Sequence, residues 1–221
     1  MTKSEADCQS TSPFRVALTI DAEFADRPTE PGATARLFDV LADDGIPAAV
    51  FIQGRWVIGE PALARRVAGE GHLVANHSHH HAPMTLLTGR GIVCDVLEAE
   101  QAIVDATGVN PRPWFRCPFG AGARSTRVNR RLAEPGYRDV SWHVDSLDWE
   151  GADAELVADR IVRGTIEHGD GAVVLVHGWP GATPDAVRGS VRRLRDEGAT
   201  FVRLDTLPDV PGMRLPADDA T

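Results

Sequence analysis

The apolar positions of this chain fall into short runs, and the stretches between them carry the spacing of amphipathic helices. The short runs are apolar at consecutive positions, which is typical of parallel strands covered on both faces. Several of the helical stretches end in glycine, a common helix stop. The pattern predicts an α/β fold, namely a distorted, incomplete (β/α) barrel with about seven parallel strands. The predicted strands are 15–20, 48–52, 72–75, 114–116, 137–142, 172–176 and 200–204, and the predicted helices are 34–43, 61–69, 90–107, 125–133, 154–167 and 184–197.

The length of 221 residues and a hydrophobic content of 43% fit one folded domain. We expect this domain to span residues 14–207, with flexible tails at 1–13 and 208–221. Three cysteines with irregular spacing predict free thiols instead of a disulfide framework. The sequence leaves the oligomeric state open.

Charge and hydropathy limit the partners of the chain. The net charge of −9 argues against a nucleic-acid partner and against an anionic membrane surface. No apolar run approaches the roughly 18 residues that a membrane span needs. The first residues lack the apolar segment of a secretory signal, so we expect a cytoplasmic protein.

Five segments with catalytic residue types follow five of the predicted strands. Because the carboxyl ends of parallel strands meet at one face of a β/α structure, we expect these segments to form a single site. Together they offer carboxylates, histidines and an arginine, a set that suits hydrolysis by water activated with a divalent metal ion. The segments are Asp21-Ala22-Glu23, His77-Ser78-His79-His80-His81, Arg116-Cys117-Pro118-Phe119-Gly120, Asp145-Ser146-Leu147-Asp148-Trp149 and Leu175-Val176-His177.

Each segment alone also has a simpler explanation. Asp21 could cap a turn, and His177 could be an ordinary buried histidine at the end of an apolar strand. Arg116 could be a surface ion-pair partner, and Trp149 and Leu175 could be plain core residues. The ordered set is more specific than any of its members.

The five segments resemble, in order, the motifs of the polysaccharide deacetylases, carbohydrate esterase family four, whose fold is a distorted β/α barrel. The family motifs read T-F-D-D-G, H-[ST]-x-x-H, R-x-P-[YF]-G, D-x-x-D-W and L-x-H. Residues 19–23, 77–81, 116–120, 145–149 and 175–177 are similar to them, so the likeness extends over most of the chain.

The resemblance implies a role for each polar residue. Asp21 would be the catalytic base, Arg116 would hold its carboxylate, and His77 and His81 would bind the metal. His177 would be the general acid, with its pKa raised by the charge of Asp148. The implied cofactor is a divalent ion, most simply zinc, with cobalt, manganese and nickel as alternatives.

The same resemblance implies a small apolar pocket for the acyl methyl group, formed by Trp149 and Leu175. Phe119 and Trp179 are further substrate-binding candidates, Trp179 on its position alone. The implied reaction is hydrolysis of an N-acyl group, most simply N-acetyl, from an amino sugar. We expect a small amino-sugar metabolite or glycoside as the substrate, because no secretion signal is visible.

The chain departs from the family in its first motif, where Ala22 replaces the aspartate that is the third metal ligand. We expect Glu23 to supply this carboxylate, and we expect an aspartate at position 22 to rebuild the family's ligand. Two alternatives stay open, namely a metal-independent, allantoinase-like amide hydrolase and a non-catalytic sugar-binding barrel. A pairing of His77 with His80 instead of His81 also stays open.

A rival enzyme class is suggested by His177-Gly178-Trp179-Pro180, which resembles the H-G-x-P segment of α/β-hydrolases. That fold requires a later G-x-S-x-G turn, then an acid and a final histidine. No histidine follows His177, so this alternative fails on chain order.

Overall fold

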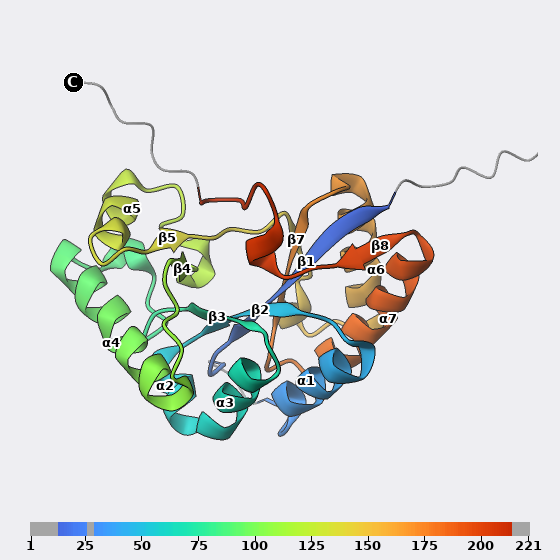
Figure 1. The fold of residues 1–221 in the computed structure, drawn as a ribbon, viewed down its shortest axis with the longest axis horizontal. Helices are drawn as coiled ribbons and strands as arrows, with labels where there is room; N and C mark the ends of the chain where they lie inside the picture. The colour runs from blue at the N-terminus through green and yellow to red at the C-terminus, as the bar shows by residue number, and fades with distance from the viewer. Residues whose placement is uncertain (1–12, 26–28, 214–221) are drawn as a thin grey trace, which may run out of the picture.

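The computed structural model describes residues 13–25 and 29–213. Within these ranges, strands and helices alternate along the chain (Figure 1). The strands are β1 (Phe14–Ala22), β2 (Ala48–Ile52), β3 (Leu73–Asn76), β4 (Trp114–Phe115), β5 (Arg138–Asp139), β6 (Val144–Asp145), β7 (Ala172–His177) and β8 (Ala199–Phe201). The α-helices are α1 (Ala33–Asp44), α2 (Gly54–Gly59), α3 (Pro61–Gly69), α4 (Gly89–Thr107), α5 (Thr126–Ala133), α6 (Ala154–His168) and α7 (Thr183–Asp196).

All pairings in the sheet are parallel, in the order β5-β4-β3-β2-β1-β7-β6, with β8 paired to the start of β1. The end strands β5 and β6 follow one another closely in the chain, so the sheet curls back on itself without closing. The predicted distorted, incomplete barrel is confirmed. Figure 1 shows the helices in an arc around the outer face of this curled sheet.

Strand β1 lies in the middle of the sheet, and its side chains alternate between two cores. Val16, Leu18, Ile20 and Ala22 pack outward into the core beneath the helices. Ala17 belongs to the core inside the curled sheet, and Asp21 lines a cavity at its mouth. This period of two places Asp21 and Glu23 on the inner side and residue 22 on the helix side.

The inner face of the sheet is covered by the chain that follows β8. Leu204, Leu207 and Val210 pack there against Phe51 and Val173. The backbone of Pro211 also accepts a hydrogen bond from Ser141 N, at 2.9 Å. The packed chain therefore continues beyond residue 207, where the sequence predicted a flexible tail. The rest of both predicted tails, residues 1–12 and 214–221, lies outside the described residues.

Two elements escaped the sequence prediction. The predicted strand 137–142 is shortened to the two residues of β5, and β6 lies just after it and was not predicted, which gives eight strands instead of seven. Helix α2 is six residues long and follows β2 directly. Among the described residues, we find no helix that combines the length and the apolar character required to cross a membrane.

The burial of Ala22 predicts the effect of a charge at this position. Ala22 is 1% exposed within the helix-side core, so Ala22→Asp would bury a carboxylate among apolar side chains. We expect this variant to lose about 3 kcal/mol or more of unfolding free energy, measured by urea denaturation. Residue 22 faces away from the cavity, which argues against the expectation that an aspartate here rebuilds a metal ligand.

The matched control is Ala62→Asp, at an exposed position in the first turn of α3, where a negative charge is tolerated. We expect its unfolding free energy to stay close to wild type. An Ala22→Asp protein as stable as this control would contradict the assignment of residue 22 to the helix-side core.

Candidate active site

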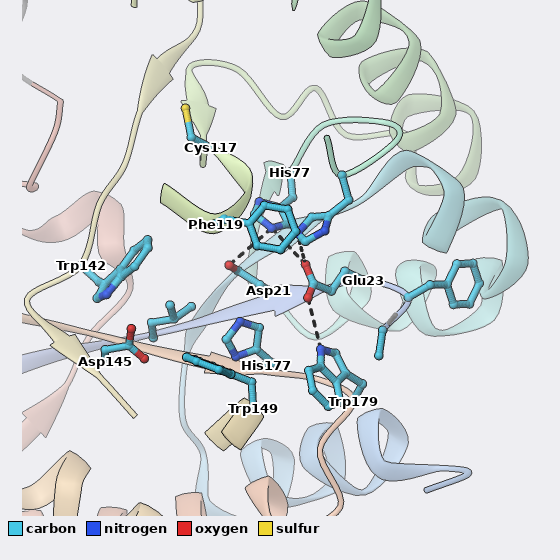
Figure 2. Close-up of a pocket in the computed structure, with 14 residues that line it drawn as sticks. Asp21, Glu23, His77, Cys117, Phe119, Trp142, Asp145, Trp149, His177 and Trp179 are labelled. Atoms are coloured by element: carbon cyan, nitrogen blue, oxygen red, sulfur yellow. Dashed lines mark hydrogen bonds and ion pairs between the residues drawn. The ribbon is translucent and has the colours of Figure 1, made fainter. Parts of the chain in front are cut away.

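A cavity of about 320 Å³ opens at the carboxyl ends of β1, β3 and β7 (Figure 2). Most of the predicted site residues line it, while Arg116 and Asp148 are buried behind the lining and hold two of its members. The predicted residues on the lining are Asp21, Glu23, His77, His81, Phe119, Trp149, Leu175, His177 and Trp179.

Three potential metal ligands converge on one side of this cavity. Glu23 Oε2 lies 3.2 Å from His77 Nε2 and 2.5 Å from His81 Nε2. The ligand atoms of the three residues all lie within 4.8 Å of one another. Glu23 Oε2 is buried and has no hydrogen-bond partner of good geometry in the protein. Two imidazoles and one carboxylate form a donor set that suits zinc or a similar divalent ion.

The electrostatics of this trio also favour a cation. Burial acts to raise the pKa of Glu23, but the close approach and the charges of His77 and His81 outweigh it, so the pKa lies well below its ordinary value. Burial acts to lower the pKa of His77, but the charges of Asp21 and Glu23 raise it overall. The carboxylate is thus held ionised, as a metal ligand must be.

Backbone and side-chain hydrogen bonds orient the two histidines. His77 Nδ1 lies 3.0 Å from the carbonyl oxygen of Arg116. Because a carbonyl only accepts, Nδ1 carries a proton there and Nε2 faces the cavity. Ser78 Oγ accepts from His81 N, and buried Asn76 Oδ1 accepts from Ser78 N. Ser78 therefore shapes the loop between the two ligands.

The other two histidines of this segment point elsewhere. His80 Nδ1 lies 3.1 Å from the buried carboxylate of Asp95, which also accepts from the backbone of His79 and His80. Pairing of His77 with His81 is therefore the arrangement found in the structure. His79, His80 and Glu98 form a second group with possible ligand atoms.

That second group suits a metal less well. His79 Nδ1 is buried against Gly54 without a hydrogen-bond partner, and its Nε2 lies 3.4 Å from Glu98 Oε1. Hence the ring proton belongs on Nε2, which faces the Glu98 carboxylate. A metal ion on Nε2 would shift this proton to Nδ1, which has no acceptor there.

Arg116 and Asp21 form a buried ion pair beside the metal ligands. Arg116 Nη1 donates to Asp21 Oδ1 at 2.8 Å, and Arg116 Nε donates to the carbonyl oxygen of Val140. The guanidinium also stacks over the ring of Phe51, 4.0 Å from its centroid. The other oxygen of Asp21 faces His77 Nε2 at 3.5 Å. Arg116 therefore fixes the carboxylate and leaves one oxygen toward the cavity.

His177 lies next to Asp21, in register with it across β1 and β7. Its Nδ1 lies 2.7 Å from Asp148 Oδ1, and its backbone N donates to Asp148 Oδ2. Thr183 Oγ1 donates to the same carboxylate at 2.7 Å. Burial acts to lower the pKa of His177, but the hydrogen bond and charge of Asp148 raise it to about 9. The imidazolium form is therefore stable at neutral pH.

Apolar and aromatic side chains form the rest of the cavity. Leu175 is buried, whereas Trp149 and Phe119 are 38% and 63% exposed at the rim. The Phe119 ring packs against His81, with centroids 4.5 Å apart. Trp179 Nε1 donates to Glu23 Oε1 at 3.2 Å, a contact that its sequence position did not reveal.

Cys117 also lines the cavity but is not suited to act as a nucleophile. Burial and the nearby charge of Asp139 raise the pKa of its thiol, so the thiolate is disfavoured. Among the described cysteines, Cys94 and Cys117 are free thiols, and Cys8 lies outside the described residues.

Several supporting residues were not found from the sequence. Asn76, Asp95 and Thr183 all lie in parts of the chain that seemed to be plain strand, helix or loop. Only for Asp95 did the sequence contain a sign of a supporting role, because it shares the apolar face of α4 with Ile92 and Ala99. A carboxylate on such a face usually has a specific partner.

Comparison with known proteins agrees with this geometry. Residues 9–140 match the family model described as polysaccharide deacetylase. The chain is 32% identical over 194 residues to the peptidoglycan-N-acetylglucosamine deacetylase PgdA of Listeria monocytogenes, covering 87% of this chain and 38% of that protein. It therefore spans about two fifths of that relative's length.

Two further similarities bear on the site. A chitooligosaccharide deacetylase of Rhizobium leguminosarum bv. trifolii is 35% identical over 164 residues, 74% of this chain and 72% of that protein. In structure, the chain resembles a carbohydrate esterase family 4 pseudoenzyme from Bacillus anthracis, in the form of a mutant whose enzymatic activity was restored. That likeness has a TM-score of 0.77 and 26% identity, and covers 90% of this chain and 69% of the other.

The contact between His177 and Asp148 predicts a measurable pKa difference. In metal-free protein, an NMR titration should give His177 a pKa of about 9. Asp148→Asn removes the anionic neighbour that stabilises the imidazolium, so the pKa should fall by roughly one pH unit or more. His72, far from this pair in the sheet, should titrate alike in both proteins. An unchanged His177 pKa in the variant would contradict the assigned pair.

Proposed function

The chain belongs to the polysaccharide deacetylase family, and from this premise we propose that it is a divalent-metal-dependent hydrolase that removes the N-acetyl group of an amino sugar. One observation carries the proposal, namely that a base, a trio of metal ligands and an acid surround a single cavity. Asp21 and His177 are neighbours in the sheet, and Glu23, His77 and His81 converge beside Asp21.

Asp21 is suited to accept a proton from the attacking water. Its carboxylate is fixed by Arg116, which leaves the oxygen facing the cavity free to accept. When bound by Glu23, His77 and His81, a divalent ion supplies Lewis acidity, which polarises the acyl carbonyl and makes water more acidic.

His177 is suited to protonate the leaving nitrogen. The amine of an amide is a poor leaving group until it is protonated, so the acid must hold a proton at neutral pH. Asp148 meets this need by stabilising the imidazolium, and Thr183 fixes the carboxylate that does so. His177 Nδ1 faces Asp148, which leaves Nε2 as the atom that gives the proton.

The apolar side of the cavity fits an acetyl methyl group beside a sugar ring. Leu175 and Trp149 line the cavity near His177, and the exposed ring of Phe119 and the half-buried ring of Trp179 offer flat faces to a sugar. The named activities of the two relatives have the N-acetyl group of a sugar in common. The size of the substrate lies between a small amino-sugar metabolite, which the sequence led us to expect, and a sugar polymer.

Particular residues of the site argue against two alternative functions, a metal-independent amide hydrolase and a non-catalytic sugar-binding barrel. In this chain the buried carboxylate of Glu23 faces the Nε2 atoms of His77 and His81. A metal-independent amide hydrolase would not need this arrangement. A non-catalytic barrel has a precedent in the pseudoenzyme, but this chain keeps the ion pair of Asp21 with Arg116 and that of His177 with Asp148. The cytoplasmic location stays a prediction.

The first test is catalysis. Wild-type protein with zinc should release acetate from N-acetylglucosamine, chitooligosaccharides or peptidoglycan, and the best of these identifies the substrate size. Asp21→Asn and His177→Ala should each lower kcat by a factor of about 10² or more. His168→Ala, on the exposed end of α6, should keep wild-type turnover. Full activity in both site variants would contradict the assigned roles.

The second test is metal binding. Purified protein loaded with zinc should hold about one ion per chain, and Glu23→Ala and His81→Ala should each lower the occupancy and the activity together. Added zinc should restore part of both. His80→Ala, which alters the same loop but points to Asp95, should keep its ion. Loss of the ion in His80→Ala but not in His81→Ala would reverse the ligand assignment.

A further inference from the structure

We propose that Trp179 is a positioning residue whose indole N–H holds the Glu23 carboxylate in the orientation that binds the metal. The inference rests on the proposed metal site. Trp179 Nε1 donates to Glu23 Oε1 at 3.2 Å, while Glu23 Oε2 faces His77 and His81 (Figure 2). The two oxygens of one carboxylate thus have separate partners.

Glu23 needs such a partner because it replaces a shorter ligand and follows the last residue of β1. Its backbone is held on both sides by Gln53, whose N donates to Ala22 O and whose Oε1 accepts from Phe24 N, both at 2.9 Å. These bonds fix the main chain but leave three side-chain torsions. Glutamate loses more rotamer entropy than aspartate when its carboxylate is held in place. A fixed donor on Oε1 removes that freedom before the ion binds.

Trp179 is itself attached to a rigid part of the molecule. It lies two residues after His177, and the adjoining Gly178 N donates to Asp21 O at 3.0 Å. Thr34 Oγ1 of α1 donates to Gly178 O at 2.9 Å. A Cβ on residue 178 would lie 3.1 Å from the Thr34 side chain, so the segment approaches α1 closely. The donor is therefore placed by β1 and α1 together.

The character of the donor matters as well. An indole N–H donates one hydrogen bond, carries no charge and cannot bind a metal itself. It therefore occupies Oε1 without reducing the negative charge on Glu23, and Oε2 is the oxygen presented to the ion. Partners of this kind, outside the ligands themselves, typically contribute about 10- to 100-fold to metal affinity.

The experiment compares zinc affinities by competition with a chromophoric chelator, without substrate. Trp179→Phe keeps an aromatic ring but removes the N–H, and its zinc Kd should rise about 10- to 100-fold. Trp142→Phe is the matched control, because Trp142 lines the same cavity beside Asp145 and away from Glu23 (Figure 2). Its zinc Kd should stay within about threefold of wild type.

A second comparison separates positioning from a general effect on folding. In a Glu23→Ala background, Trp179→Phe should have no further effect on zinc affinity, because the carboxylate it orients is gone. Excess zinc should return the kcat of Trp179→Phe toward wild type. An unchanged zinc Kd in Trp179→Phe, or an equal loss with and without Glu23, overturns the role of Trp179 alone. Wild-type protein that binds no zinc overturns the proposed metal site and this inference with it.

Discussion

Two carboxylates are buried side by side at the mouth of the curled sheet, and the rest of the site compensates their charge. Asp21 is paired with the guanidinium of Arg116, itself 1% exposed. Glu23 has no such cation and faces the imidazoles of His77 and His81 instead. An uncompensated buried charge is strongly destabilising, so the imidazoles must carry a proton or share a metal ion with Glu23. A divalent ion meets this need without protonating the ligands.

The arrangement follows from the central position of β1. This strand is hydrogen-bonded to β2, β7 and β8, and its inner residues alternate with those packed beneath the helices. Asp21 therefore lies beside His177 of β7, and Glu23 reaches the loop that follows β3. The same alternation sends residue 22 to the helix side. The chain can thus keep its metal carboxylate on residue 23 while an alanine occupies position 22.

From the sequence, the fold and the residues that form the site could be predicted better than the contacts between those residues. The long apolar runs of β1, β2 and β7 revealed the parallel sheet, and polar residues after them revealed the site. Two-residue strands such as β6 leave no periodic signal, so the eighth strand was missed. The direction of residue 22 depends on where β1 ends, which one sequence does not show.

Contacts between segments that are distant in the sequence could not be predicted either. Asp95 holds the backbone of His79 and His80 from the middle of α4, and Thr183 reaches Asp148 from the start of α7. Such partners are set by how helices pack on the sheet, and no local spacing encodes them. Trp179 was noted as a rim residue, whereas its donation to Glu23 required the geometry of both strand ends.

The most direct test of this account is the position of the ion itself. A crystal structure of the zinc-loaded protein, with anomalous data collected at the zinc edge, locates the ion independently of any assay. The account predicts one strong peak about 2.0–2.2 Å from Glu23 Oε2 and about 2.0–2.1 Å from His77 Nε2 and His81 Nε2. A peak held by His79, His80 and Glu98 instead, or a Glu23 carboxylate turned away from the ion, would contradict it.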